Sequence, residues 1–275
     1  MRSKTASIAQ SLPQAVSASQ MQEEIQTEQG PLEDLLVGFE DFDLDQVDLE
    51  ALPTEAKPDP FLWGPGIHLI QSIPEADISL YAPLSAHELS GVLIRYGEQL
   101  YKFDWNYSRY LFHAAWADFD HDGNCELAVG ICTMYGTALF HEELHIVRLG
   151  ENGQAEDFPI PEELYKKELT SKLSCEADYE TNQISVGLND VKVQFPPILG
   201  LPTNSNSPLQ IQPIYNIISY MFADGVIIAD YGIPVYCEEK KLPELSASVE
   251  AYVSFNRENE FGLYNLSLKV DAESD

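Results

Sequence analysis

Basic residues are scarce in this chain of 275 residues. It carries 15 Lys and Arg residues against 45 Asp and Glu residues, which gives a formal net charge of −30. A field of that sign repels phosphate backbones and anionic lipid, and it attracts cations. The composition therefore argues against nucleic acid and membrane-surface partners, and it favours a cation as a partner.

The chain also lacks a long apolar run. No segment approaches the ~20 residues needed to span a bilayer, so we expect no transmembrane segment. No signal peptide is visible either, because the residues that follow Arg2 and Lys4 are too polar for its apolar core. Either the protein is cytoplasmic or a signal peptide has been removed, and we expect the second because of the acidic pattern at residues 118–126.

Cysteines are few, and none forms a CxxC pair, which argues against a zinc ribbon or a thioredoxin-type motif. Four cysteines permit two disulfides, but their spacing selects no pairing: Cys125, Cys132, Cys175 and Cys237. The nucleophile elbow GxSxG, the P-loop and the dinucleotide fingerprint GxGxxG are absent as well. These absences favour a binding role over an enzymatic one.

Composition divides the chain near residue 58. Residues 1–58 are acidic, punctuated by proline and poor in aromatic residues, which predicts a disordered acidic tail or tether. The aspartates at positions 41, 43 and 45 lack a turn glycine, so we interpret them as a solvated acidic run. Residues 59–275 are predicted to form one domain that is mainly β, with a few helices (α+β).

Short β-rich segments separated by turn residues support this fold class. Hairpins are predicted around Gly97-Glu98, around Asn189-Asp190 and around residues 257–259. Residues 161–173 are the clearest helix. Pro161 stands at its start, and Tyr165, Leu169 and Leu173 recur every four residues on one face.

Residues 118–126, DFDHDGNCE, predict a calcium-binding loop between two strands. Calcium prefers six to eight hard oxygen ligands, and Gly123 permits the sharp turn that closes such a loop. An EF-hand is excluded because its twelfth position must be a glutamate, and that position is Val129. The candidate ligands, with a backbone carbonyl at position 124, are Asp118, Asp120, Asp122, Asn124 and Glu126.

The stretch ADFDHDGNCELAVG resembles the calcium-binding signature of bacterial FG-GAP and VCBS-repeat proteins. FDW at 103–105, Gly-Thr at 136–137 and EELHIVRL at 142–149 extend the likeness to a group of secreted or lipid-anchored clostridial-type proteins with one such loop. The resemblance implies extracellular calcium binding that stabilises a β-rich module, with the five candidate ligands above as its ligands. A complete propeller is not expected, because it needs several repeats.

An alternative function arises from residues 141–145, HEELH, which match the HExxH pattern of zinc metallopeptidases. On a helix, His141 and His145 would share a face and bind zinc, with Glu142 as the general base. The following β-branched residues favour a strand instead, where the two histidines would stand about 13 Å apart. His113, which precedes the calcium loop, is interpreted as a structural histidine.

The sequence thus favours a non-catalytic, monomeric calcium-binding module at the cell surface or outside the cell. Its expected partners are calcium and an extracellular protein or glycan. A glycan platform would use exposed aromatic side chains, and the candidates are Trp63, Trp105, Tyr107, Tyr110 and Trp116. Core packing is the competing role for the same residues.

Overall fold

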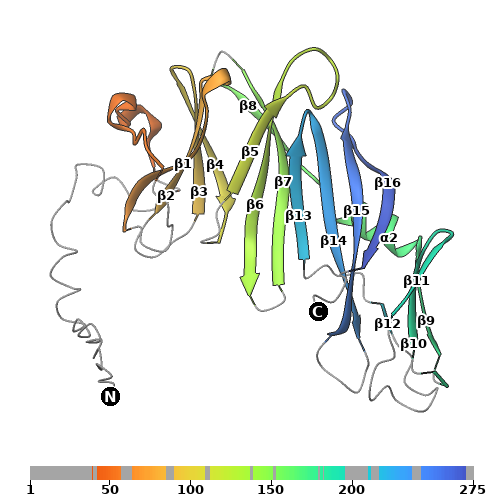
Figure 1. Cartoon of the computed structure of the whole chain (residues 1–275). Coiled ribbons are helices and arrows are strands. Elements are labelled where there is room, and N and C mark those ends of the chain that lie inside the picture. The colour runs from red at the N-terminus through yellow and green to blue at the C-terminus, as the bar shows by residue number, and fades with distance from the viewer. Residues whose placement is uncertain are drawn as a thin grey trace, which may run out of the picture.

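The protein is mainly β, as predicted (Figure 1). The computed structural model describes residues 39, 42–56, 64–84, 90–108, 112–136, 139–150, 153–178, 180–181, 183–195, 210–211, 217–236 and 243–270. In this part of the chain one α-helix accompanies three sheets of four, three and nine strands. None of the helices found there is long and apolar enough to cross a membrane.

The first sheet is an antiparallel meander. Its strands follow the chain order β1 (Gly66–Ile73), β2 (Ile78–Leu84), β3 (Ser90–Tyr96) and β4 (Gln99–Asn106). A 3₁₀ turn over Pro74–Ala76 joins β1 to β2. Gly97 has φ +59° in the turn between β3 and β4, which confirms the hairpin predicted there.

The largest sheet has the strand order β16-β15-β14-β13-β7-β6-β5, with β8 paired to β7 and β12 paired to β14. Its strands are β5 (Phe112–Ala117), β6 (Glu126–Gly136), β7 (Leu139–Leu149), β8 (Ala155–Pro159), β12 (Gln210–Ile211), β13 (Ile217–Ala223), β14 (Val226–Tyr236), β15 (Pro243–Phe255) and β16 (Phe261–Val270). The predicted C-terminal hairpin around residues 257–259 is the β15–β16 pair.

The nine-stranded sheet bends where β13 meets β7. Among the described residues of β13, Ile217 and Ile218 pair with β7, in parallel. Farther along β7, strand β8 pairs with the same edge. Beyond this junction β13 crosses toward β5, since the rings of Phe222 and His113 lie 5.0 Å apart. Side chains from both halves, such as Leu144 and Ala229, therefore share one core.

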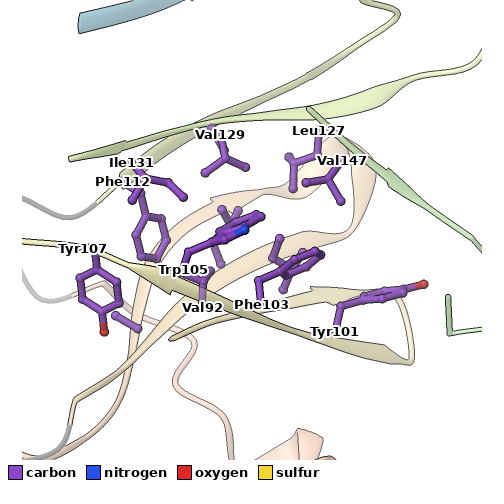
Figure 2. Close-up of a cluster of buried hydrophobic side chains, with 14 of the residues drawn as sticks. Val92, Tyr101, Phe103, Trp105, Tyr107, Phe112, Leu127, Val129, Ile131 and Val147 are labelled. Carbon is purple, nitrogen blue, oxygen red and sulfur yellow. The ribbon is translucent and has the colours of Figure 1, made fainter. Parts of the chain in front are cut away.

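The opposite face of β5–β7 packs against the first sheet (Figure 2). Leu127, Val129 and Ile131 alternate along β6 and point into this core, where Trp105 and Phe103 from β4 stack with ring centroids 4.3 Å apart. The strands β5–β7 thus form a middle layer that is buried on both faces, which is why β6 reads as an almost continuous apolar run.

Part of the segment that we predicted as a disordered tail is folded. Residues 42–56 contain two short 3₁₀ helices, Leu44–Gln46 and Leu49–Ala51, whose first turns are capped by the carboxylates of Asp43 and Asp48. Phe42 and Leu52 are buried against β1–β3. The predicted end of the tail, at residue 58, is therefore too late. The local composition could not indicate this, because the sheet face that buries these two residues is formed by residues farther along the chain.

The predicted helix is α2 (Glu162–Thr170), which begins after Pro161 and buries Tyr165 and Leu169. Leu173 was assigned to the same helical face, but it begins β9. The three-stranded sheet has the order β11-β10-β9, with β9 (Leu173–Asp178), β10 (Gln183–Leu188) and β11 (Val191–Gln194). Its β10–β11 turn confirms the hairpin predicted at Asn189-Asp190.

Candidate metal centre

The acidic loop joins β5 to β6, as the sequence predicted. The two strands pair in register from Ala117↔Glu126 down to Phe112↔Ile131, and residues 118–125 lie between them. Apolar side chains of β6 anchor this hairpin in two cores, so the ends of the loop are fixed by strand packing. The loop therefore starts from a rigid base.

Hydrogen bonds fold the loop around its first two aspartates. The carboxylate of Asp118 accepts the backbone N–H groups of Asp122 (3.0 Å) and Gly123 (3.1 Å), and Asp120 Oδ1 accepts the same Asp122 N–H at 2.9 Å. His121 and Gly123 have φ values of +58° and +97°, which turn the chain back on itself. A side chain at position 123 would meet no neighbour, so the positive φ is what requires glycine there.

Three of the five predicted ligands converge. Asp118, Asp120 and Glu126 each offer a carboxylate oxygen, and these oxygens lie within 4.8 Å of one another. Calcium–oxygen distances of about 2.3–2.6 Å place two ligands of one ion no more than about 5 Å apart, so the separation fits a single cation. Asp120 and Glu126 are 6% and 1% exposed. The group can hold a metal ion.

Burial shapes the electrostatics of this group. Removal from water raises the pKa of Glu126, although its Oε2 accepts the Phe119 N–H at 3.0 Å, which opposes the rise. Several negative charges in so small a volume repel one another unless cations lie nearby. A positive charge close to these carboxylates therefore stabilises the loop.

The structure does not bring Asp122 and Asn124 into the converging group. Asp122 Oδ1 accepts the backbone N–H (2.7 Å) and the side-chain amide (2.9 Å) of Asn124, and the backbone bond is the main reason that the pKa of Asp122 is lowered. Both residues are exposed. Their expected role as ligands stays a prediction.

Sequence reasoning missed Arg148, which lies at the end of β7. Its Nη2 donates to Asp120 Oδ2 at 2.6 Å, and its Nε lies 3.6 Å from Glu126 Oε1. The guanidinium also stacks against Phe158 and Phe255, at 5.1 and 5.4 Å from the ring centroids. No local pattern marks this arginine, because its partners come from other strands.

Two turns from the C-terminal half of the sheet close over the loop. In the turn between β15 and β16, Arg257 donates to the His121 carbonyl oxygen at 2.6 Å, and Asn259 accepts a hydrogen bond from Arg148 at 2.6 Å. A Cβ at Gly225, in the turn between β13 and β14, would lie 3.8 Å from the Asp118 carbonyl oxygen. The loop thus joins the two halves of the bent sheet.

The HEELH segment has a different geometry. It lies in strand β7 rather than on a helix, and its three candidate zinc residues have separate partners. His141 Nδ1 lies 3.1 Å from Thr133 Oγ1. Glu142 Oε1 lies 3.3 Å from His113 Nε2, and its Oε2 accepts the Tyr220 N–H at 2.8 Å. Within the described residues, no group able to hold a metal includes them.

His145 belongs to a buried polar cluster between the first sheet and β7–β8. Its Nδ1 lies 2.9 Å from Asp157 Oδ1, its ring packs on Trp105, and the indole N–H of Trp105 donates to Asp157 Oδ2 at 2.8 Å. Burial alone would lower the pKa of His145, but the hydrogen bond to Asp157 and the negative charge of Glu143, 3.9 Å from Nε2, outweigh it and raise the pKa. This histidine is a packing residue with an ionic partner.

The remaining candidate residues have structural roles where they are described. Trp105 and Tyr107 are buried in the first core, and Trp116 packs against Tyr96, so these aromatic residues form no open glycan platform. Trp63 and Tyr110 lie outside the described residues. Cys125, Cys132 and Cys175 are free thiols, and Cys237 is outside the described part.

Comparison of the chain with protein-family models, with curated proteins and with solved structures gives no match in any of the three. The likeness to FG-GAP and VCBS-repeat proteins therefore rests on the loop and its flanking residues alone.

Proposed function

We propose that this chain is a non-catalytic, extracellular calcium-binding module of the FG-GAP/VCBS-like type, in which the ion stabilises a β-rich domain. The observation that carries the proposal is the convergence of Asp118, Asp120 and Glu126. All donors are hard oxygens, which calcium prefers and which suit zinc less well than imidazole or thiolate. Water and loop carbonyls would complete the coordination.

The proposed role of the ion is to fasten one end of the bent sheet. The loop already contacts the β15–β16 turn through Arg257 and packs beside the β13–β14 turn. An ion held by β5, the loop and β6 would stiffen the element on which both turns rest. Extracellular sites of this kind bind at about 10⁻⁴–10⁻³ M, which suffices where calcium is millimolar.

The geometry gives the zinc peptidase no comparable support. A strand separates His141 from His145 by about 13 Å, beyond the reach of one ion. Glu142, the expected general base, is buried and engaged by His113 and Tyr220. The proposed macromolecular partner of the module is an extracellular protein or glycan.

The test is the substitution Asp120→Ala, which removes one of the three converging carboxylates. In the wild-type protein we expect calcium to raise the melting temperature above its value in chelator, and in the variant we expect this difference to vanish. Asp104→Ala is the matched control, because Asp104 is an exposed aspartate on β4. An equal calcium response in wild type and Asp120→Ala would refute the proposal, as would one tightly bound zinc per chain.

A further inference from the structure

Arg148 lies beside two of the three converging carboxylates, those of Asp120 and Glu126. Asp120 Oδ1 accepts the Asp122 N–H, and Glu126 Oε2 accepts the Phe119 N–H. The remaining oxygens, Asp120 Oδ2 and Glu126 Oε1, both face Arg148. The guanidinium therefore lies beside one oxygen of each buried carboxylate.

Arg148 is held in this place by contacts that do not involve the carboxylates. Its Nη1 donates to Asn259, and its guanidinium lies against the rings of Phe158 and Phe255. Its side chain is only 28% exposed. A guanidinium fixed in this way loses little conformational freedom when it pairs with a carboxylate, so it is a strong competitor.

The charge of the site points the same way. Four carboxylates lie in residues 118–126, and Arg148 offsets part of their charge from within the fold. Its fixed positive charge lowers the attraction of the loop for any further cation and repels a divalent ion brought close to Asp120. Arg257 is close as well, but it bonds a carbonyl oxygen rather than a carboxylate.

We propose that Arg148 is the affinity-determining residue of this site: an internal cation that competes with the divalent ion for Asp120 and Glu126. This inference rests on the proposed function, since it takes calcium as the ion. Binding then requires calcium to displace or share the oxygens that Arg148 holds. The competition keeps the calcium affinity low. Because Arg148 also bonds Asn259, it links the ion site to the β15–β16 turn.

The experiment is calorimetric titration of calcium into the whole chain and into Arg148→Gln. Glutamine removes the charge and keeps an N–H donor for Asp120. Since calcium then no longer competes with a charge-assisted hydrogen bond at Asp120, we expect calcium to bind at least roughly tenfold more tightly to the variant. Arg148→Lys keeps the charge but loses the fixed guanidinium, so its calcium affinity should lie between those of wild type and Arg148→Gln.

Two further arginines serve as matched controls. Arg95 on β3 bonds carbonyl oxygens at Gly97 and Leu49, so Arg95→Gln makes the same change in net charge away from the loop and should leave calcium affinity unchanged. Arg257→Gln removes a charge beside the loop without freeing a carboxylate, so we expect an increase smaller than that of Arg148→Gln.

The outcomes separate the two proposals. Unchanged or weaker calcium binding in Arg148→Gln, beside measurable binding in wild type, overturns the competition and leaves the calcium function standing. No binding by either protein at 10 mM calcium, on the order of ten times the weakest expected constant, overturns both. Binding by Arg148→Gln alone, with none by wild type, supports the competition and overturns calcium binding as the function of the wild-type loop. If the variant folds only with calcium, the calcium dependence of its melting temperature gives the same constant.

Discussion

Two segments of this chain, residues 118–126 and residues 141–145, carry spacings that are typical of metal sites, and they fold differently. In the first, a chain reversal at His121 and Gly123 brings carboxylates from both ends of the loop together. In the second, an extended strand sends neighbouring side chains to separate partners. A ligand spacing thus has meaning only for the backbone conformation that it presumes, and HExxH presumes a helix.

The sharpest way to test this contrast is to neutralise one buried glutamate in each segment. Glu126→Gln should abolish the calcium-dependent stabilisation, which amounts to about 2.7 kcal/mol when calcium is at a hundredfold excess over its dissociation constant. Glu142→Gln should keep the full calcium response, because Glu142 serves His113 and Tyr220 instead. Chemical denaturation with calcium and with chelator measures both.

Each glutamine variant is the control for the other, since both remove one buried carboxylate charge. Glu142→Gln keeps an acceptor for the Tyr220 N–H, so we expect a loss of about 1 kcal/mol that is the same with and without calcium. A calcium response lost in Glu142→Gln, or a stabilising effect of zinc that depends on Glu142, would contradict the contrast drawn here.

The second prediction concerns the pH dependence of His145. Its pKa is raised above the usual 6.5 in the folded protein by Asp157 and Glu143, against the effect of burial. The protonated ring therefore stabilises the fold fully below about pH 6.5, and this contribution is lost as the pH rises through the folded-state pKa. We expect the free energy of unfolding of wild type to exceed that of His145→Gln by up to about 1.5 kcal/mol at pH 5.5. At pH 8.5 we expect a smaller difference.

Urea denaturation of both proteins across this pH range measures the difference, and Asp157→Asn provides the control. Because Asp157 bonds both His145 and Trp105, its neutral variant should lose the same pH-dependent contribution. A difference between wild type and His145→Gln that grows with pH would show that the histidine is buried neutral. Such a result would weaken the assignment of His145 to an ionic packing cluster.

Features that depend on residues close together in the sequence could be predicted, and contacts between distant strands could not. The hairpins at Gly97 and Asn189 and the loop at 118–126 depend on neighbouring residues, so they could be predicted. The contact of Arg148 with Asp120 and the burial of Leu52 depend on how distant strands pack, and no local pattern encodes them. The HEELH segment shows the same limit. Its spacing is a local pattern, but the partners of His141 and Glu142 lie on other strands.

The smallest effect is expected at Asn124. The loop pattern predicts that its backbone carbonyl binds calcium, whereas in the structure its side-chain amide bonds Asp122. If the residue contributes its backbone carbonyl to calcium, Asn124→Ala keeps the ligand and loses only the side-chain bond to Asp122. We then expect calcium affinity to change by less than about threefold, or roughly 0.7 kcal/mol. Asp118→Asn, which weakens a converging carboxylate in the same loop, should cost at least about tenfold in the same titration. A comparable loss in Asn124→Ala would mean that the amide side chain, rather than the carbonyl, positions the loop for the ion.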